Sequence, residues 1–180
     1  AEEAFLRGAD VTLIRGANAV EPQYFFNDIK IHSVKDLFEE IKKNIKNADI
    51  MIHAAAVSDF TINGKSNEKI KSNQNLHLEL TPTTKIFENI KKLKKNILLI
   101  GFKAEFNVSE KVLVERAYGL LKDANADFVV ANDVSKKDRG FDVETNEVFI
   151  VDKNKKIKHL ALADKRAIGN GILDEIKKII

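Results

Sequence analysis

The segment Asp49-Ile-Met-Ile-His-Ala-Ala-Ala-Val-Ser-Asp59 decides the fold of this chain. Residues 50–56 are a continuous apolar run of strand length, as expected for a strand covered on both faces of a sheet. Small side chains at the end of such a strand let a ligand approach the backbone. Ten residues after Asp59 comes Lys69-Ile-Lys71. A carboxylate can orient a hydroxyl or a metal ion and a lysine can meet a phosphate, so the segment predicts a nucleotide or phosphorylated ligand.

The flanking sequence alternates strand and helix patterns. Helix caps are predicted at Ser33, at Thr83 or Thr84, at Ser109 and at Asp164. A long polar loop at 61–75 precedes a short strand at 77–80. Further strands are predicted at 11–14, 29–31, 97–102 and 128–131, and a hairpin at 148–151 and 157–160. The order predicts a Rossmann-like, three-layer α/β fold, with a mostly parallel sheet, helices on both faces and a C-terminal β-hairpin.

Composition narrows the class of protein. The chain has 180 residues, a formal charge of +3 and no cysteine. One domain of this size has a substantial core, and the balanced charge argues against a nucleic-acid partner. Absence of cysteine excludes thiol nucleophiles and thiolate metal sites within the chain and fits a cytoplasmic protein. The four histidines are far apart in sequence, and His53 is expected to be a core histidine with its hydrogen bonds satisfied.

The first eight residues have the pattern of a helix end, with Gly8 at the C′ position. No N-cap precedes this helix. We therefore expect residues 1–180 to be a single nucleotide-binding domain that lacks its first strand and glycine-rich turn, a common phosphate-binding place in doubly wound folds.

Three predicted strands end in small or polar residues, and parallel strands bring their carboxyl ends to one edge of the sheet. Four motifs occur in order: Ala55-Ala-Val-Ser-Asp59, Lys69-Ile-Lys71, Gly101-Phe102 with Glu105, and Ala131-Asn132-Asp133. As an ordered set they resemble phosphopantothenate–cysteine ligases of coenzyme A biosynthesis, prokaryotic type. The ten-residue step from Asp59 to Lys69 matches the spacing in that family, and the likeness extends over essentially the whole chain.

The resemblance implies a ligase that joins 4'-phosphopantothenate to cysteine through an acyl-nucleotide intermediate. Prokaryotic members mostly use CTP with Mg²⁺, although the sequence does not choose between CTP and ATP. Members of the family are dimers, so a homodimer is expected, without a membrane partner. Many are fused behind a flavoprotein decarboxylase, in which case FMN belongs to that upstream domain.

Site residues also follow from the resemblance. Lys69 would neutralise the triphosphate and activate it, and Asp59 would lie beside the nucleotide and its metal. Ala55 and Ser58 would line the site, and Phe102 would pack on the base or ribose. The remaining expected contacts are Pro82 and Thr83 near the base, and Asn132 with Asp133 bordering the cleft.

The chain also departs from the family pattern. An Asn in an Ile-Ser-Asn segment, which handles the acyl-nucleotide, would precede Ala1. Bacterial members carry lysines where this chain has Leu120 and Ala124, so phosphate contacts from that helix cannot be carried over.

An alternative is a short-chain or extended NAD(P)-dependent dehydrogenase. Tyr118-Gly-Leu-Leu-Lys122 fits a Tyr-x-x-x-Lys pair, in which the lysine lowers the tyrosine pKa for proton exchange with a carbonyl. This reading does not account for Lys69-Ile-Lys71 or Ala131-Asn132-Asp133. A third alternative is a non-catalytic nucleotide-binding or assembly domain.

Overall fold

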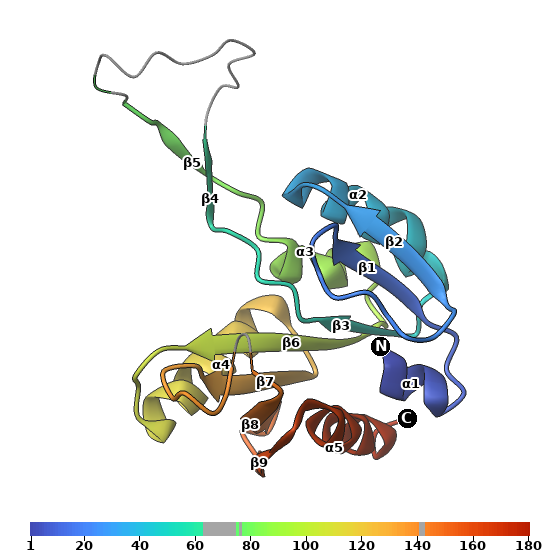
Figure 1. Ribbon diagram of the computed structural model, residues 1–180, viewed down its shortest axis with the longest axis vertical. Helices are drawn as coiled ribbons and strands as arrows, with labels where there is room; N and C mark the ends of the chain where they lie inside the picture. Colours follow the sequence, from blue (N-terminus) through green and yellow to red (C-terminus); the bar gives the residue numbers. More distant parts are fainter. Residues whose placement is uncertain (63–74, 76, 141–142) are drawn as a thin grey trace.

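A computed structural model describes residues 1–62, 75, 77–140 and 143–180 (Figure 1). Its largest sheet has the strand order β3-β6-β7-β8-β9. β3, β6 and β7 are mutually parallel, and β8 and β9 add an antiparallel hairpin at one edge, as predicted. The strands span Ile50–His53 (β3), Leu98–Glu105 (β6), Phe128–Asp133 (β7), Thr145–Asp152 (β8) and Ile157–Asp164 (β9).

A separate parallel pair, β1 (Thr12–Gly16) and β2 (Asn27–Ile31), lies beside β3. Its polar centre is Arg15, whose guanidinium donates two hydrogen bonds of 2.8 Å to the Asp28 carboxylate. The Arg15 side chain is almost completely buried, so this fork-to-carboxylate pairing offsets the cost of burying the charge.

Helices cover both faces of the large sheet, as predicted. α2 (Val34–Asn44), α3 (Ile86–Leu93) and α4 (Glu110–Ala124) contribute to the same core cluster as Leu99 and Val129. α5 (Lys165–Lys177) packs with Ile100 and Val130, which point to the opposite face because side chains alternate along a strand. α1 (Glu2–Leu6) lies against α5, and a short 3₁₀ turn, η1 (Ile45–Asn47), follows α2. Nowhere in the described ranges is a helix long and apolar enough to cross a membrane.

A two-stranded arm extends away from this body (Figure 1). β4 (Phe60–Ile62) pairs antiparallel with β5 (Leu80–Pro82). Phe60, Ile62 and Leu80 each expose more than half of their surface. The sequence predicts a polar loop from residue 61 and a strand at 77–80. Both boundaries were wrong. Residues 60–62, with the apolar side chains of Phe60 and Ile62, form the strand β4, and β4 pairs in register with residues 80–82.

The other predictions of helix caps and strands are confirmed, with two exceptions. Ser33, Ser109 and Asp164 accept the expected capping hydrogen bonds, and Gly8 adopts φ +87° after α1. β3, however, ends at His53, and Ile52 is 40% exposed, so this strand is not covered on both faces. The N-cap of α3 is Lys85 and has no side-chain capping bond, so the predicted cap at Thr83 or Thr84 was wrong.

Candidate functional site

The parallel strands bring the predicted motifs to one edge of the sheet. Register pairs His53 of β3 with Gly101 of β6, and Glu105 of β6 with Asp133 of β7. The chain leaves β3 through three exposed alanines, Ala54 to Ala56, and reaches Asp59 beyond the sheet. Three of the four quoted motifs therefore converge at the carboxyl edge, where open α/β sheets bind ligands. Lys69, with Lys71, lies outside the described residues.

Asp59 is paired with a lysine that the sequence analysis missed. The Lys85 ammonium donates a hydrogen bond to the Asp59 carboxylate, and both side chains are more than half exposed. The Lys85 hydrogen bond and charge, with a smaller contribution from Lys103, hold the pKa of Asp59 below its usual value. Asp59 is therefore ionised at neutral pH beside an exposed ammonium. This pair offers one oxygen ligand for a metal ion and one cation for a phosphate.

Thr83 joins the two chain segments that carry this pair. Its backbone N–H donates to the carbonyl of Asp59 at 2.9 Å, and its hydroxyl donates to the carbonyl of Ser58. The Ser58 hydroxyl in turn donates to the carbonyl of Phe60 at 2.8 Å. Ser58 and Thr83, both predicted as site residues, thus fix the backbone around Asp59, and Thr83 performs this task instead of capping α3.

The other predicted contacts are more dispersed. Phe102 lines a groove of about 430 Å³ together with Ile52 and Ala54, on the α5 side of the sheet. Lys165 and Arg166, at the start of α5, also line this groove. Ala55 is exposed just beyond β3. Pro82 is opposite Phe60 in the arm, at the arm's base.

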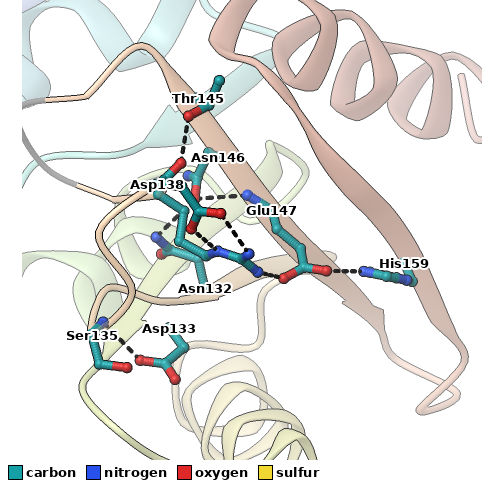
Figure 2. Close-up of polar contacts among 9 residues, drawn as sticks. Asn132, Asp133, Ser135, Asp138, Thr145, Asn146, Glu147 and His159 are labelled. Carbon is teal, nitrogen blue, oxygen red and sulfur yellow. Dashed lines mark hydrogen bonds and ion pairs between the residues drawn. The ribbon is translucent and has the colours of Figure 1, made fainter.

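Asn132 and Asp133 hold the loop that follows β7 (Figure 2). Asn132 is 8% exposed, and its amide donates to Asn146 Oδ1 at 3.3 Å. Asp133 Oδ1 accepts the N–H groups of Ser135 at 2.9 Å and Asn107 at 3.0 Å. Burial alone would raise the pKa of Asp133, but these hydrogen bonds hold it below its usual value. Both residues border the edge of the sheet, and their contacts stabilise turns.

A second polar cluster next to Asn132 was not expected from the sequence. The Glu147 carboxylate pairs with Arg139. It also pairs with His159, as Figure 2 shows. His159 Nε2 lies 2.9 Å from Glu147, and its ring stacks on Phe149 with centroids 4.5 Å apart. These contacts tie the loop after β7 to β8 and β9. Only the hairpin prediction could have suggested that Glu147 and His159 meet.

His53 contradicts its expected role. Its Nε2 atom is buried and has no hydrogen-bond partner among the described residues, because the neighbouring Phe87 ring, 5.7 Å away between centroids, offers no acceptor. Burial lowers the pKa of His53, so the imidazole is neutral at pH 7.

Tyr118 and Lys122 do form a pair on α4. The Lys122 ammonium lies over the ring face, 5.1 Å from its centroid, and Lys155 approaches the same ring at 5.3 Å. These contacts describe a cation–π cluster on the helix surface. Within the ranges that the structure covers, no group of three or more His, Asp or Glu side chains is placed to hold a metal ion.

Comparisons with known proteins agree on one family. The profile of the DNA/pantothenate metabolism flavoprotein C-terminal domain matches residues 1–180. The coenzyme A biosynthesis bifunctional protein CoaBC of Thermococcus kodakarensis is 41% identical over 182 residues, covering 100% of this chain and 44% of that protein. The protein of the same name from Methanocaldococcus jannaschii is 33% identical and covers 99% of the chain and 43% of its own length. The chain thus spans less than half the length of these relatives.

Solved structures give the same result. A DNA/pantothenate metabolism flavoprotein from Streptococcus pneumoniae superposes with a TM-score of 0.84 at 27% identity, over 99% of this chain and 85% of that one. A C-terminal domain of CoaBC gives a TM-score of 0.75 at 28% identity, over 98% and 79% of the two chains.

Proposed function

Because the chain belongs to the family of DNA/pantothenate metabolism flavoprotein C-terminal domains, we propose that it is the ligase domain of a phosphopantothenate–cysteine ligase. The structural observation that supports this is the Asp59–Lys85 pair at the carboxyl edge of parallel strands. A phosphate-binding cation and a metal-binding carboxylate at that edge suit a nucleoside triphosphate.

The reaction proposed has two steps. A carboxylate oxygen of 4'-phosphopantothenate attacks the α-phosphorus of CTP, and the bond to pyrophosphate breaks, giving an acyl-cytidylate. The cysteine amine then attacks the acyl carbon and gives up one proton to solvent, an amide bond forms, and CMP leaves with the bonding electrons. Catalysis of such steps depends on positioning and on neutralising the charge that develops on the phosphates.

The chain's residues would divide these tasks. Asp59 would take one coordination position on the Mg²⁺ that arrives with CTP, while phosphate oxygens supply others. Lys85, released from Asp59, would join Lys69 in neutralising the triphosphate. Phe102 would pack against the base or ribose, with Ala55, Ser58, Pro82, Thr83 and Asn132 completing the walls.

Assembly and context are part of the same proposal. The arm's exposed apolar side chains, Phe60, Ile62 and Leu80, favour a homodimer in which a second copy covers them, because an isolated two-stranded ribbon is marginally stable in water. A flavoprotein decarboxylase with FMN and a cytoplasmic location also stay predictions.

The test is a coupled assay with 4'-phosphopantothenate, cysteine, Mg²⁺ and either CTP or ATP. Release of pyrophosphate with formation of the amide product is expected, and omission of cysteine should let the acyl-nucleotide accumulate. Lys69→Gln should abolish the first step without unfolding the protein, and Lys85→Gln should slow it. Wild-type turnover in Lys69→Gln would refute the assignment of Lys69.

A binding experiment separates the alternatives. A ligand at about 100 times its Kd stabilises the folded state by about 2.7 kcal/mol. A thermal shift with Mg·CTP and none with NADPH would support the ligase. A shift with NADPH alone would favour the dehydrogenase that uses Tyr118 and Lys122.

A further inference from the structure

The hairpin of β8 and β9 has an irregular register next to the carboxyl edge of the sheet. Asn146 of β8 pairs with Ala163 of β9. Two residues further along β8, Val148 pairs with Leu160, which is three residues before Ala163 in the sequence. The strand β9 therefore carries one extra residue opposite Glu147. A β-bulge of this kind bends the strand and redirects the neighbouring side chains, and bulges are common next to active sites.

The Asn146 side chain beside this bulge bonds to two donors (Figure 2). Its Oδ1 atom accepts the backbone N–H of Glu147 at 2.9 Å and the side-chain amide of Asn132 at 3.3 Å. An asparagine side chain has one acceptor oxygen and one donor nitrogen, so only the nitrogen end of the Asn132 amide can face the Asn146 oxygen. Asn146 therefore fixes the direction in which the Asn132 amide is turned.

The carbonyl oxygen of the Asn132 side chain is consequently turned away from Asn146. No described residue donates a hydrogen bond to this oxygen, and the oxygen is not closed off from solvent. The residue as a whole is only 8% exposed. An acceptor in such an enclosed place costs free energy unless water or a ligand bonds to it. The oxygen is thus available to a hydrogen-bond donor of a ligand.

Asn132 shares a face of the sheet with Phe102. Register pairs Phe102 of β6 with Val130, two residues before Asn132 in β7. Because side chains alternate along a strand, the side chains of Phe102 and Asn132 lie on the same side, which is the side that α5 covers. The groove that Phe102 lines is also on this side. The Asn132 oxygen is therefore placed next to a base that packs on Phe102.

We propose that Asn146 is a positioning residue through which the site selects bases that carry an exocyclic amino group. The inference rests on the proposed function, in which a base packs on Phe102, and adds that the amino group of this base donates to the Asn132 oxygen. Cytosine and adenine carry such a group. Uracil and hypoxanthine have a carbonyl oxygen in its place, which would face the Asn132 oxygen with no proton between them. A turned amide would reverse the preference, because its N–H groups would then face the base.

Nucleotide binding is tested first, without acid substrate or cysteine. Titration calorimetry compares the Mg²⁺ complexes of CTP and ATP with those of their oxo counterparts, UTP and ITP. The tighter binder of CTP and ATP should exceed its oxo counterpart by about tenfold or more, as expected when a hydrogen bond to an enclosed group is lost. Equal affinities within that pair would overturn the inference and leave the ligase proposal intact. Binding of none of the four nucleotides would contradict both.

A pair of substitutions then tests the role of Asn146. In Asn146→Ala the Asn132 amide can turn, so the ratio of the two affinities should fall to about threefold or less. Asn146→Asp keeps an oxygen for both N–H groups and should restore the wild-type ratio. A merely structural role of Asn146 would weaken both nucleotides equally and leave their ratio unchanged. An unchanged ratio in Asn146→Ala would therefore refute the positioning role.

Two further variants complete the series. Asn146→Ser retains a hydroxyl for the Glu147 N–H but ends one bond short of Asn132, so it should lower the ratio even if the alanine variant does not fold. Asn154→Ala is the control, because Asn154 is an exposed residue in the turn of the same hairpin. It should leave both affinities unchanged.

Kinetics separate this inference from the proposed function. In the ligase assay, Asn146→Ala should lower the ratio of the KM values for the oxo and amino nucleotides and leave the KM for cysteine unchanged. Selection of the amino base without any ligase turnover would support the role of Asn146 and contradict the proposed function. Turnover with equal KM values for the two nucleotides in the wild-type protein would do the reverse.

Discussion

The five-stranded sheet and the β4–β5 arm differ in how their apolar side chains are covered. Leu99 in β6 and Val129 in β7 are 0% exposed, enclosed by helices of the same chain. Phe60 and Ile62 in β4 are 55% and 51% exposed, and among the described strands β4 pairs with β5 alone. The sheet can therefore be stable by itself, whereas the arm gains most from a second molecule. Substitutions in the two regions should affect different properties.

The largest effect is expected in the centre of the sheet. Leu99→Ala leaves a cavity among α3, α4 and β7, and should lower the free energy of unfolding by about 2–5 kcal/mol. Chemical denaturation measures the change. Leu162→Ala in β9, where the side chain is 42% exposed, is the matched control and should change stability by less than about 0.5 kcal/mol. Equal losses in the two variants would contradict the assignment of the core.

Gly101→Ala is expected to have the next largest effect. A Cβ at this position would overlap the Phe87 ring, so α3 or the ring must move. Overpacking of this kind costs about 1–3 kcal/mol. Gly16→Ala in β1 is the control and should be nearly neutral, because a Cβ there meets no atom of the described residues within 4 Å. A thermal melt that shows no difference between the two variants would exclude the contact with Phe87.

Asp127 should make the stability of the sheet depend on pH. Burial would raise its pKa, but the Leu99 N–H and the ammonium groups of Lys153 and Lys91 hold it below the usual value. A lowered pKa stabilises the fold above the unfolded value of about 3.9, and this contribution disappears as pH falls through the folded value.

Asp127→Asn should therefore cost about 1.5 kcal/mol at pH 7, the lower end for a hydrogen bond to a charged group, and less at pH 3. Urea denaturation at both pH values measures the loss. The exposed Asp10→Asn is the control. A loss for Asp127→Asn that is the same at both pH values would mean that Asp127 is not the titrating group.

The smallest change in stability is expected in the arm. Phe60→Ser combined with Ile62→Ser should alter the free energy of unfolding of the monomer by no more than about 0.5 kcal/mol. The same variant should shift the sedimentation equilibrium from dimer to monomer. Val20→Ser, at a 91% exposed position outside the arm, should retain the wild-type assembly. A monomeric wild-type protein, or a dimeric double variant, would contradict the proposed role of the arm.

Local signals explain what the sequence could predict. Ser33, Ser109 and Asp164 each cap a helix whose first-turn N–H lies three residues away, so the determinant and its effect are in the same short segment. The alternation of strands and helices and the hairpin follow from periodicity. These features were enough to place the carboxyl edge of the sheet and the motifs around Asp59.

Long-range pairings explain what the sequence could not predict. Lys85 meets Asp59 across 26 residues, and their approach depends on how α3 packs on β6. Ile52 has an apolar side chain in an apolar run, and only the position of β1 shows that its face borders a groove. The cluster of Arg139, Glu147 and His159 likewise requires the register of β8 and β9.

The Phe87 ring packs directly on Gly101, where no side chain intervenes, and this contact fixes the position of α3 along β6. Lys85 is the N-cap residue of α3, two residues before Phe87. The packing of Phe87 on Gly101 therefore also sets the position of Lys85 beside Asp59. Evolution could therefore exchange the charged groups at this edge without touching the core, but could not easily change their spacing. To change the nucleotide specificity, one should vary the charged residues Asp59 and Lys85 and keep the Phe87–Gly101 contact.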